Sequence, residues 1–168
     1  MNTARDLSAP GQKRAIRDLL QALFVAELLK SSKPLWIASA WISDIELLDN
    51  TARQFSALYP DWPAGVIRLS EVIRALLERG GEVIILSRDA PHNQAFARKM
   101  EALPGAKMLM TPAFHEKDIV GEHFLLSGSM NFTYSGITLN DEHLVYRCDA
   151  ASIQERRLVM AEKWRSHL

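Results

Sequence analysis

Apolar residues follow two different spacings along this chain, and these spacings predict its helices and strands. From Arg14 to Lys30 they recur every three or four residues, which is typical of an amphipathic helix. Residues 35–42, LWIASAWI, form a continuous apolar run instead, which favours a strand buried on both faces. The same patterns predict further helices at 71–79, after Pro91 and after Ser152, and further strands at 83–87, 107–111, 118–120, 123–126 and 143–147.

The order of these elements predicts the fold class. Helices and strands alternate early in the chain, which indicates parallel strands joined by crossover helices. Later, Gly121–Glu122 separates two adjacent strands and has the form of a tight hairpin turn, which adds antiparallel pairing. We therefore expect an α/β fold with a mixed β-sheet flanked by helices on both faces.

Polar segments of the sequence indicate where the expected domain begins and where it contains a loop. Residues 1–12 are predicted to be a flexible N-terminal arm, and residues 13–168 to be a single domain. Residues 50–68 are interpreted as a loop or insertion, in which Trp62 is a candidate for contact with a substrate. Ser70 is expected to cap the helix that follows it, and Ser152 to open the last helix as part of a capping box.

Composition narrows the class of protein. The 168 residues carry no formal net charge, which argues against a general nucleic-acid coat because such proteins need a surplus of Lys and Arg. Cys148 is the single cysteine, so no disulfide can form within the chain. The polar N-terminal sequence lacks the apolar core of a signal peptide, and no apolar run approaches the roughly 20 residues that span a bilayer. We expect a cytoplasmic protein that does not enter the membrane.

The segment HEKDIVGEHFLLSGSMN, residues 115–131, contains the candidate chemistry. Residues two apart in an extended chain project to the same side, so His115 and Lys117 are expected to point together, as are Ser129 and Asn131. Lysine supplies positive charge to a phosphate, and Ser and Asn donate hydrogen bonds to its oxygens. Histidine can act as nucleophile or as general acid and base near neutral pH. Gly128 would let the backbone approach the ligand closely.

A carboxylate that holds the second ring nitrogen improves a histidine nucleophile. Asp141 and Glu142 begin the next predicted strand, and Glu142 is the preferred candidate for this role. A metal site that pairs His123 with His115 is disfavoured, because the eight-residue gap suits no usual zinc spacing. We expect neither a metal ion nor a cofactor. His143 is interpreted as a strand-surface residue or as a residue that supports the site from behind, and not as a second catalyst.

The motif residues resemble the signature of the phospholipase D superfamily, in which H-x-K is followed by G-S-x-N-F-T and then by a glutamate about ten residues later. The resemblance covers roughly residues 34–147 and implies a phospholipase D-like fold. One departure concerns Glu122, which stands where the family usually has Asp, with a spacer to Gly128 that is one residue short. Either Glu122 substitutes for that acid or the turn deletes the position. The matching residues are His115, Lys117, Gly128, Ser129, Asn131, Phe132, Thr133 and Glu142.

The resemblance also implies a mechanism in which one histidine attacks a phosphodiester and a second protonates the leaving alcohol. Only one H-x-K occurs in the chain, so a homodimer that shares its site would have to supply the second histidine. Small members with a single motif are often nucleases, which favours a metal-independent phosphodiesterase acting on DNA. The chain is also similar in general appearance to the phospholipase-D-like component of bacterial systems that modify DNA with deazaguanine and restrict unmodified DNA.

Two alternative functions remain. The chain could be a nucleic-acid-binding subunit of a restriction or defence complex with little activity alone, acting with other proteins of that system. It could instead be a phospholipase or phosphatidyl transferase, although that class is expected to show two motifs in one chain or apolar entry loops.

Overall fold

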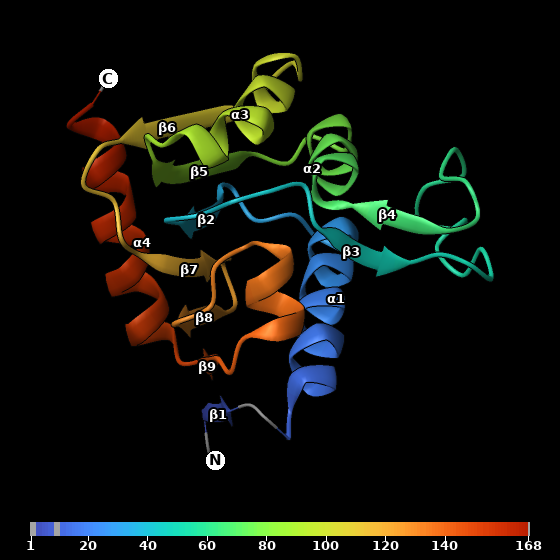
Figure 1. Cartoon of the computed structure of the whole chain (residues 1–168), viewed down its shortest axis with the longest axis horizontal. Helices are drawn as coiled ribbons and strands as arrows, with labels where there is room; N and C mark the ends of the chain where they lie inside the picture. Colours follow the sequence, from blue (N-terminus) through green and yellow to red (C-terminus); the bar gives the residue numbers. More distant parts are fainter. Residues whose placement is uncertain (1–2, 9–10, 168) are drawn as a thin grey trace.

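A mixed β-sheet forms the centre of the molecule (Figure 1). The computed structural model describes residues 3–8 and 11–167, and over these residues seven strands join in the order β1-β9-β8-β7-β2-β5-β6. β2 pairs in parallel with β5 and β5 with β6, whereas the other pairs are antiparallel. The strands are β1 (Ala4–Ser8), β2 (Leu35–Ser39), β5 (Val83–Arg88), β6 (Lys107–Thr111), β7 (Lys117–Val120), β8 (Leu125–Gly128) and β9 (His143–Arg147).

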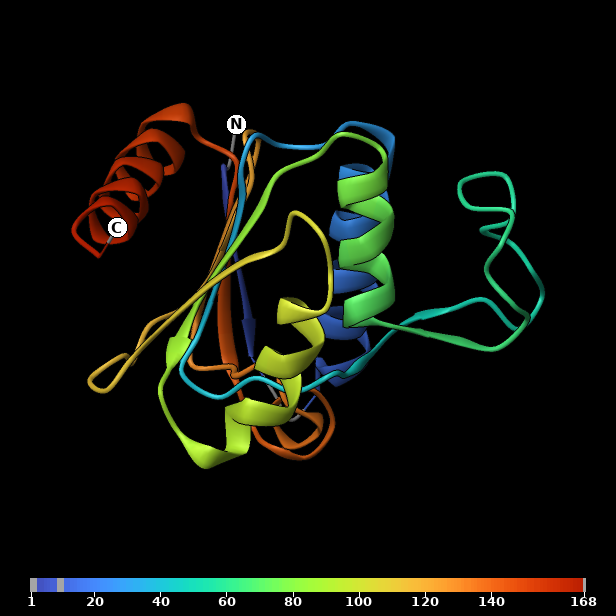
Figure 2. The same cartoon turned by 90° about the horizontal axis from the view of Figure 1, so that it is seen from above.

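Helices cover both faces of the sheet, as the sequence predicts (Figure 2). One face carries α1 (Lys13–Leu29), α2 (Leu69–Glu78) and α3 (Gln94–Glu101), and the other carries α4 (Ala150–Arg165). Alternate residues of a strand pack on opposite faces of the sheet. Ile37 of β2 belongs to the core cluster beneath α1 and α2, and Trp36 belongs to the cluster beneath α4. The mixed α/β sheet flanked on both faces is therefore confirmed.

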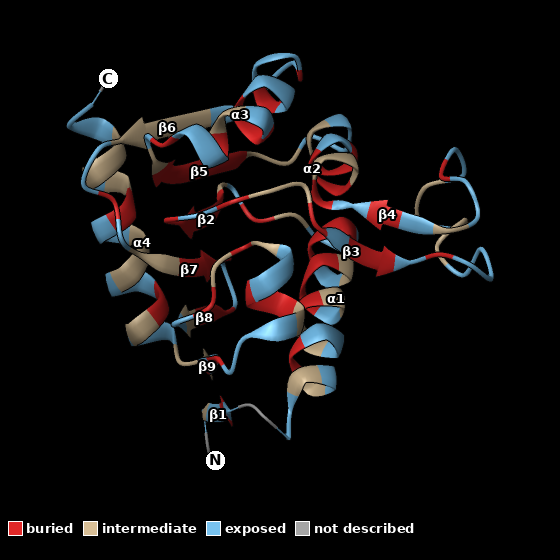
Figure 3. Ribbon diagram, in the orientation of Figure 1, coloured by how far each residue is buried: buried red, intermediate tan, exposed pale blue. Residues whose placement is uncertain are grey.

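Burial is deepest in the central strands and uneven over α4 (Figure 3). All five residues of β2 are buried, because both faces of this strand are covered. On α4, Ile153 and Met160 face the sheet, whereas Leu158 and Val159 are exposed. In the described part of the chain, no helix is long and apolar enough to cross a membrane.

The expected flexible arm contains a strand. Residues 4–8 form β1, which pairs with β9 along its whole length from Ala4↔Arg147 to Ser8↔His143. Leu7 is buried in the main core and anchors this strand. Without β1 the edge of β9 would expose unpaired backbone groups, so the pairing has a clear physical advantage. The segment's polar composition concealed it, because only one side chain of the strand is buried.

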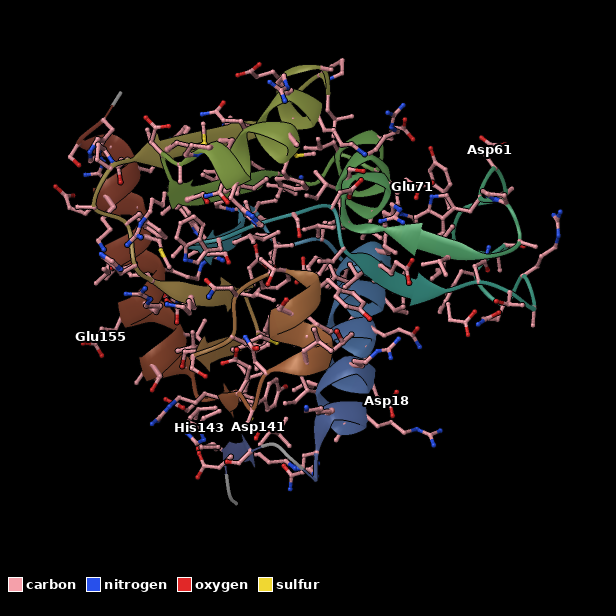
Figure 4. All side chains as sticks on the ribbon, viewed as in Figure 1. Asp18, Asp61, Glu71, Asp141, His143 and Glu155 are labelled. Atoms are coloured by element: carbon pink, nitrogen blue, oxygen red, sulfur yellow. The ribbon has the colours of Figure 1, made fainter. Side chains whose placement is uncertain are left out.

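The segment 50–68, expected to be a loop, ends in a strand at 66–68, and the rest of it forms the outer part of a projecting arm. β3 (Glu46–Asp49) and β4 (Val66–Arg68) form a separate two-stranded sheet, and the intervening residues extend away from the body (Figure 1). Trp62 is 4% exposed, with its ring centroid 5.0 Å from that of Tyr59. Trp62 therefore packs inside the arm and does not present a surface for a substrate. Asp61 lies near the outer end of the arm (Figure 4).

Some local details differ from the expected ones. Val120 pairs with Leu125, and the Gly121 backbone N–H donates to the Phe124 backbone oxygen at 3.0 Å. The β7–β8 turn is therefore centred on Glu122 and His123, one residue later than predicted. α2 starts at Leu69, one residue before Ser70, and the Ser70 hydroxyl donates to Asp44 at 2.9 Å.

The last helix also begins earlier than predicted. It starts at Ala150, and the Asp149 side chain accepts a hydrogen bond from the Ser152 backbone N–H at 2.9 Å. Asp149 is therefore the N-cap, a position for which Asp is as well suited as Ser.

Candidate active site

The motif residues meet at one edge of the sheet. Ser39 at the end of β2 is level with Ser87 on β5 and with Lys117 at the start of β7. Gly128 ends β8 at the same edge, because β7 and β8 run antiparallel from their turn. The carboxyl ends of β2, β5 and β8 thus converge with the start of β7, the kind of place where α/β sheets bind ligands.

A buried amide holds this edge together from behind. Asn93, which is fully buried, donates from Nδ2 to the backbone oxygens of Ala40 at 2.9 Å and Arg88 at 2.7 Å. Its Oδ1 accepts from the Ile42 backbone N–H at 2.9 Å. Asn93 therefore bonds to the ends of β2 and β5 together, and these bonds fix where the chain continues beyond each strand.

His115 and Lys117 flank the start of β7. His115 is exposed and lies in an irregular segment two residues before the strand, so the hydrogen bonds between the strands do not hold it. The Lys117 ammonium donates to the His115 backbone oxygen at 2.9 Å, and within the described residues it forms no ion pair. In the described structure, the Lys117 charge is therefore tied to the backbone of His115 and has no carboxylate within ion-pair distance.

The G-S-x-N segment follows β8 closely. A Cβ on Gly128 would lie 2.0 Å from the His143 backbone oxygen, so any side chain would force the chain apart here. Asn131 Oδ1 accepts from the Trp41 backbone N–H at 3.1 Å. That N–H needs an acceptor, which fixes the amide orientation and turns Nδ2 away from the bond. In the part of the chain described, Nδ2 has no partner, so it can donate to a ligand.

Glu142 is buried and lies against Ser129. The Ser129 hydroxyl donates to Glu142 Oε2 and accepts from the His143 backbone N–H at 3.0 Å. Asn140 donates to the other carboxylate oxygen at 3.2 Å. Neither oxygen bonds to His115 within the described residues, so the single chain does not show the expected carboxylate–histidine pair. The Ser129 hydroxyl is held by Glu142 and would have to rotate to donate to a phosphate.

Arg88, which the motif does not include, contacts His115. It ends β5, and its Nη2 lies 2.5 Å from Nδ1 and 2.7 Å from Nε2 of His115. Its Nε donates to the Phe114 backbone oxygen at 3.1 Å, and its Cζ lies 5.2 Å from the centroid of the Trp41 ring. The sequence does contain a signal that could have pointed to Arg88. It is a charged residue directly after the apolar run VIILS, at the carboxyl end of a buried strand.

The side of β7 opposite Lys117 is tied to α4. Asp118 is buried and pairs with Arg156, which also bonds to Glu116 at 2.7 Å. Burial raises the pKa of Asp118, and the guanidinium of Arg156 opposes that rise. These contacts join the strand that carries Lys117 to α4 and give Glu116 and Asp118, its neighbours in sequence, an arginine partner.

The other candidates lie away from this edge. His123 and Glu122 are in the β7–β8 turn at the opposite end of the hairpin, where Glu122 Oε1 accepts from the Lys33 backbone N–H at 3.1 Å. His143 bonds to Ser8 of β1 at 3.0 Å and lies near Asp141 on the surface (Figure 4). In the described ranges, no group of three or more His, Cys, Asp or Glu side chains could hold a metal ion.

Comparison with known proteins places the fold. No family model matches the chain, and neither does any curated protein sequence. Among solved structures, NucT from Helicobacter pylori is similar with a TM-score of 0.69 at 16% identity, covering 97% of this chain and 96% of its own. Nuc from Salmonella typhimurium, a phospholipase D family member, is similar with a TM-score of 0.58 at 17% identity, covering 96% of this chain and 93% of its own. The chain has a phospholipase D-like fold.

The structure is also similar to that of a protein described as a DNA-binding chromatin protein. TrmBL2, an archaeal chromatin protein with a novel mode of DNA binding, is similar with a TM-score of 0.54 at 14% identity. The match covers 98% of this chain and 53% of that one. Proteins of different description therefore share this fold, so the fold alone does not determine the activity.

Proposed function

We propose that this protein is a nuclease-type phosphodiesterase that cleaves nucleic acid, most readily DNA, through a phosphohistidine at His115. The observation that carries the proposal is the convergence of an exposed imidazole, the Lys117 ammonium and the Asn131 amide at one sheet edge. Two of these groups donate to anions and the third is a nucleophile, which is the set that phosphoryl transfer requires. The fold it shares with NucT and Nuc supports the proposal.

The reaction has two steps. A ring nitrogen of His115 attacks phosphorus and forms a P–N bond while the P–O bond to the leaving alcohol breaks. The His115 side chain of a second copy of this chain gives its proton to that alcohol oxygen. The same imidazole then takes a proton from water, whose oxygen attacks phosphorus and breaks the P–N bond, restoring both histidines.

The other residues act on the phosphate oxygens. Lys117 supplies charge to a non-bridging oxygen, and Asn131 donates from Nδ2 to another. We assign Ser129 to the same oxygens once its hydroxyl turns from Glu142, and Gly128 to the close approach of the backbone. Glu142 would then orient Ser129 in this copy or a histidine ring across the dimer. No step in this reaction uses a metal ion or a cofactor.

A covalent trap tests the intermediate. An end-labelled DNA oligonucleotide incubated with the protein in EDTA and quenched during turnover should leave a phosphoryl–DNA adduct on His115, found by mass spectrometry. His115→Asn should show no adduct and still melt at the wild-type temperature. Turnover without any adduct on a histidine would overturn the proposed chemistry. DNA binding without cleavage of any phosphodiester would favour the alternative, a binding subunit.

Subunit mixing tests the shared site. If each site needs two copies of His115, equal amounts of wild-type and His115→Asn chains that exchange freely should give roughly a quarter of the wild-type activity per site rather than half. A monomer with full activity at working concentration contradicts the dimer. The cytoplasmic location and the link to a DNA-restriction system rest on the sequence alone and stay predictions.

A further inference from the structure

Arg88 holds the nucleophile of the proposed reaction in the described structure. Its Nη2 lies within 2.7 Å of both ring nitrogens of His115. A guanidinium only donates hydrogen bonds, so it needs a ring nitrogen with a lone pair. A neutral imidazole has one such nitrogen, so only one of the two contacts can be a hydrogen bond. The nitrogen that accepts it is also the atom that would attack phosphorus. Contact with Arg88 and attack on a substrate are therefore mutually exclusive.

Arg88 also has no anionic partner in the described residues. It appears in no ion pair, although it is only half-exposed, and its nearest polar contacts are the Phe114 backbone oxygen and the imidazole. A permanent charge bonded to neutral acceptors gains more from an anion, because charge-assisted hydrogen bonds are roughly twice as strong as neutral ones. Among the described residues, neither of the two cations at this site, Arg88 and Lys117, lies within ion-pair distance of a carboxylate.

Two contacts besides those to His115 hold the Arg88 side chain in place. Nε is bonded to Phe114, and the guanidinium lies over the Trp41 ring, so both contacts restrict where the fork can move. The Trp41 backbone N–H also donates to Asn131, so Trp41 links the arginine to the residue whose amide is expected to hold phosphate. A small rotation of the guanidinium can then replace its contact with the imidazole by hydrogen bonds to two non-bridging phosphate oxygens. A planar guanidinium can bond to two oxygens at once, which an ammonium group does less well.

We propose that Arg88 is a phosphate-binding residue of this site that rests on His115 in the unliganded protein and transfers to the phosphate when a phosphodiester binds. Binding of substrate thereby releases the attacking nitrogen and adds a second charge to the oxygens. This inference rests on the proposed function, although its binding step can be measured without turnover.

The experiment compares Arg88→Gln, Arg88→Lys and a control, Arg98→Gln, on the exposed side of α3. Inorganic phosphate is titrated into ¹⁵N-histidine-labelled protein while the ring signals of His115 are followed, and kcat and KM are measured on a DNA oligonucleotide. Arg88→Gln should weaken phosphate binding by about 10-fold or more and lower kcat/KM by about 10²-fold. Arg88→Lys should restore part of the phosphate affinity, and Arg98→Gln should match wild type in both.

Guanidinium rescue separates a chemical role from a structural one. At low, non-denaturing guanidinium concentrations, Arg88→Ala should regain activity and Lys117→Ala should not. If Arg88→Gln folds and keeps wild-type phosphate affinity and kcat/KM, the assignment of Arg88 is overturned while the proposed function stands. If wild type binds phosphate through Arg88 but cleaves no phosphodiester, the assignment stands and the proposed function fails.

Discussion

The two ends of the β7–β8 hairpin carry polar side chains, but they differ in whether the chain itself satisfies them. At the turn, Ser32 donates from its backbone and its hydroxyl to Glu27, both at 2.7 Å, and accepts from the Glu122 backbone N–H at 2.8 Å. At the open end, the Asn131 amide and the Lys117 ammonium keep donors without partners among the described residues. A closed network contributes stability, whereas an open one can bind a ligand.

This contrast predicts that equivalent changes at the two ends will have different consequences. The largest difference is expected between two histidines. His115→Asn should lower turnover by at least about 10³-fold, because it removes the proposed nucleophile. His123→Asn, in the turn of the same hairpin, should leave turnover unchanged. Both are exposed, so thermal melting should change little for either. Equal losses of turnover in the two variants would contradict the proposed difference between the two ends of the hairpin.

A matched pair of glycines gives the next largest effect. A Cβ at Gly121 would lie 2.5 Å from the Phe124 ring and 2.8 Å from the Glu27 carboxylate, and one at Gly128 would meet the His143 backbone at 2.0 Å. Each alanine variant should lose about 1–3 kcal/mol in urea unfolding. Only Gly128→Ala should also lose kcat per folded molecule, since the displaced segment carries Ser129 and Asn131. Full activity in folded Gly128→Ala would contradict the assignment of this segment.

Glu27 makes the turn end sensitive to pH. Burial raises the pKa of Glu27 above its ordinary 4.5, while hydrogen bonds from Ser32 and the charge of Arg157 oppose the rise and Glu122 adds to it. The folded state thus binds this proton more tightly than the unfolded state, so stability should fall as pH rises from about 4.5 through the raised pKa.

Glu27→Gln should remove this slope, because the amide does not titrate. Urea unfolding of both proteins at several pH values gives the difference between the two stability curves. Contributions from Asp118 and other carboxyls are common to both proteins and cancel in that difference. Parallel curves would contradict the predicted titration.

The smallest effect is expected for Glu122, the residue that stands where the family usually has Asp. Glu122→Ala should cost about 0.5–1.5 kcal/mol through the lost bond to the Lys33 backbone N–H. Its kcat and KM should equal those of wild type, because the side chain lies at the turn and not at the site. A drop in kcat with unchanged stability would assign Glu122 to the chemistry instead.

Local patterns were sufficient for the body of the fold and for the motif. Residues such as His115 and Asn131 could be proposed for the site because their spacing along one short segment is informative by itself. Arg88 and Trp41 could not be assigned, because their contact depends on how β5 ends beside the chain that follows β2. β1 was missed for the same reason, since a strand with one buried side chain gains its pairing from a partner more than 130 residues away.

Asn93 gives the site a dependence on a residue that never meets the substrate. Its amide joins the backbone after β2 to that at the end of β5, and these segments carry Trp41 and Arg88. Proteins with an intact H-x-K and G-S-x-N can therefore differ in catalytic power through this interior position. Efforts to alter the proposed activity should vary the exposed Trp41 ring and preserve the buried Asn93 amide.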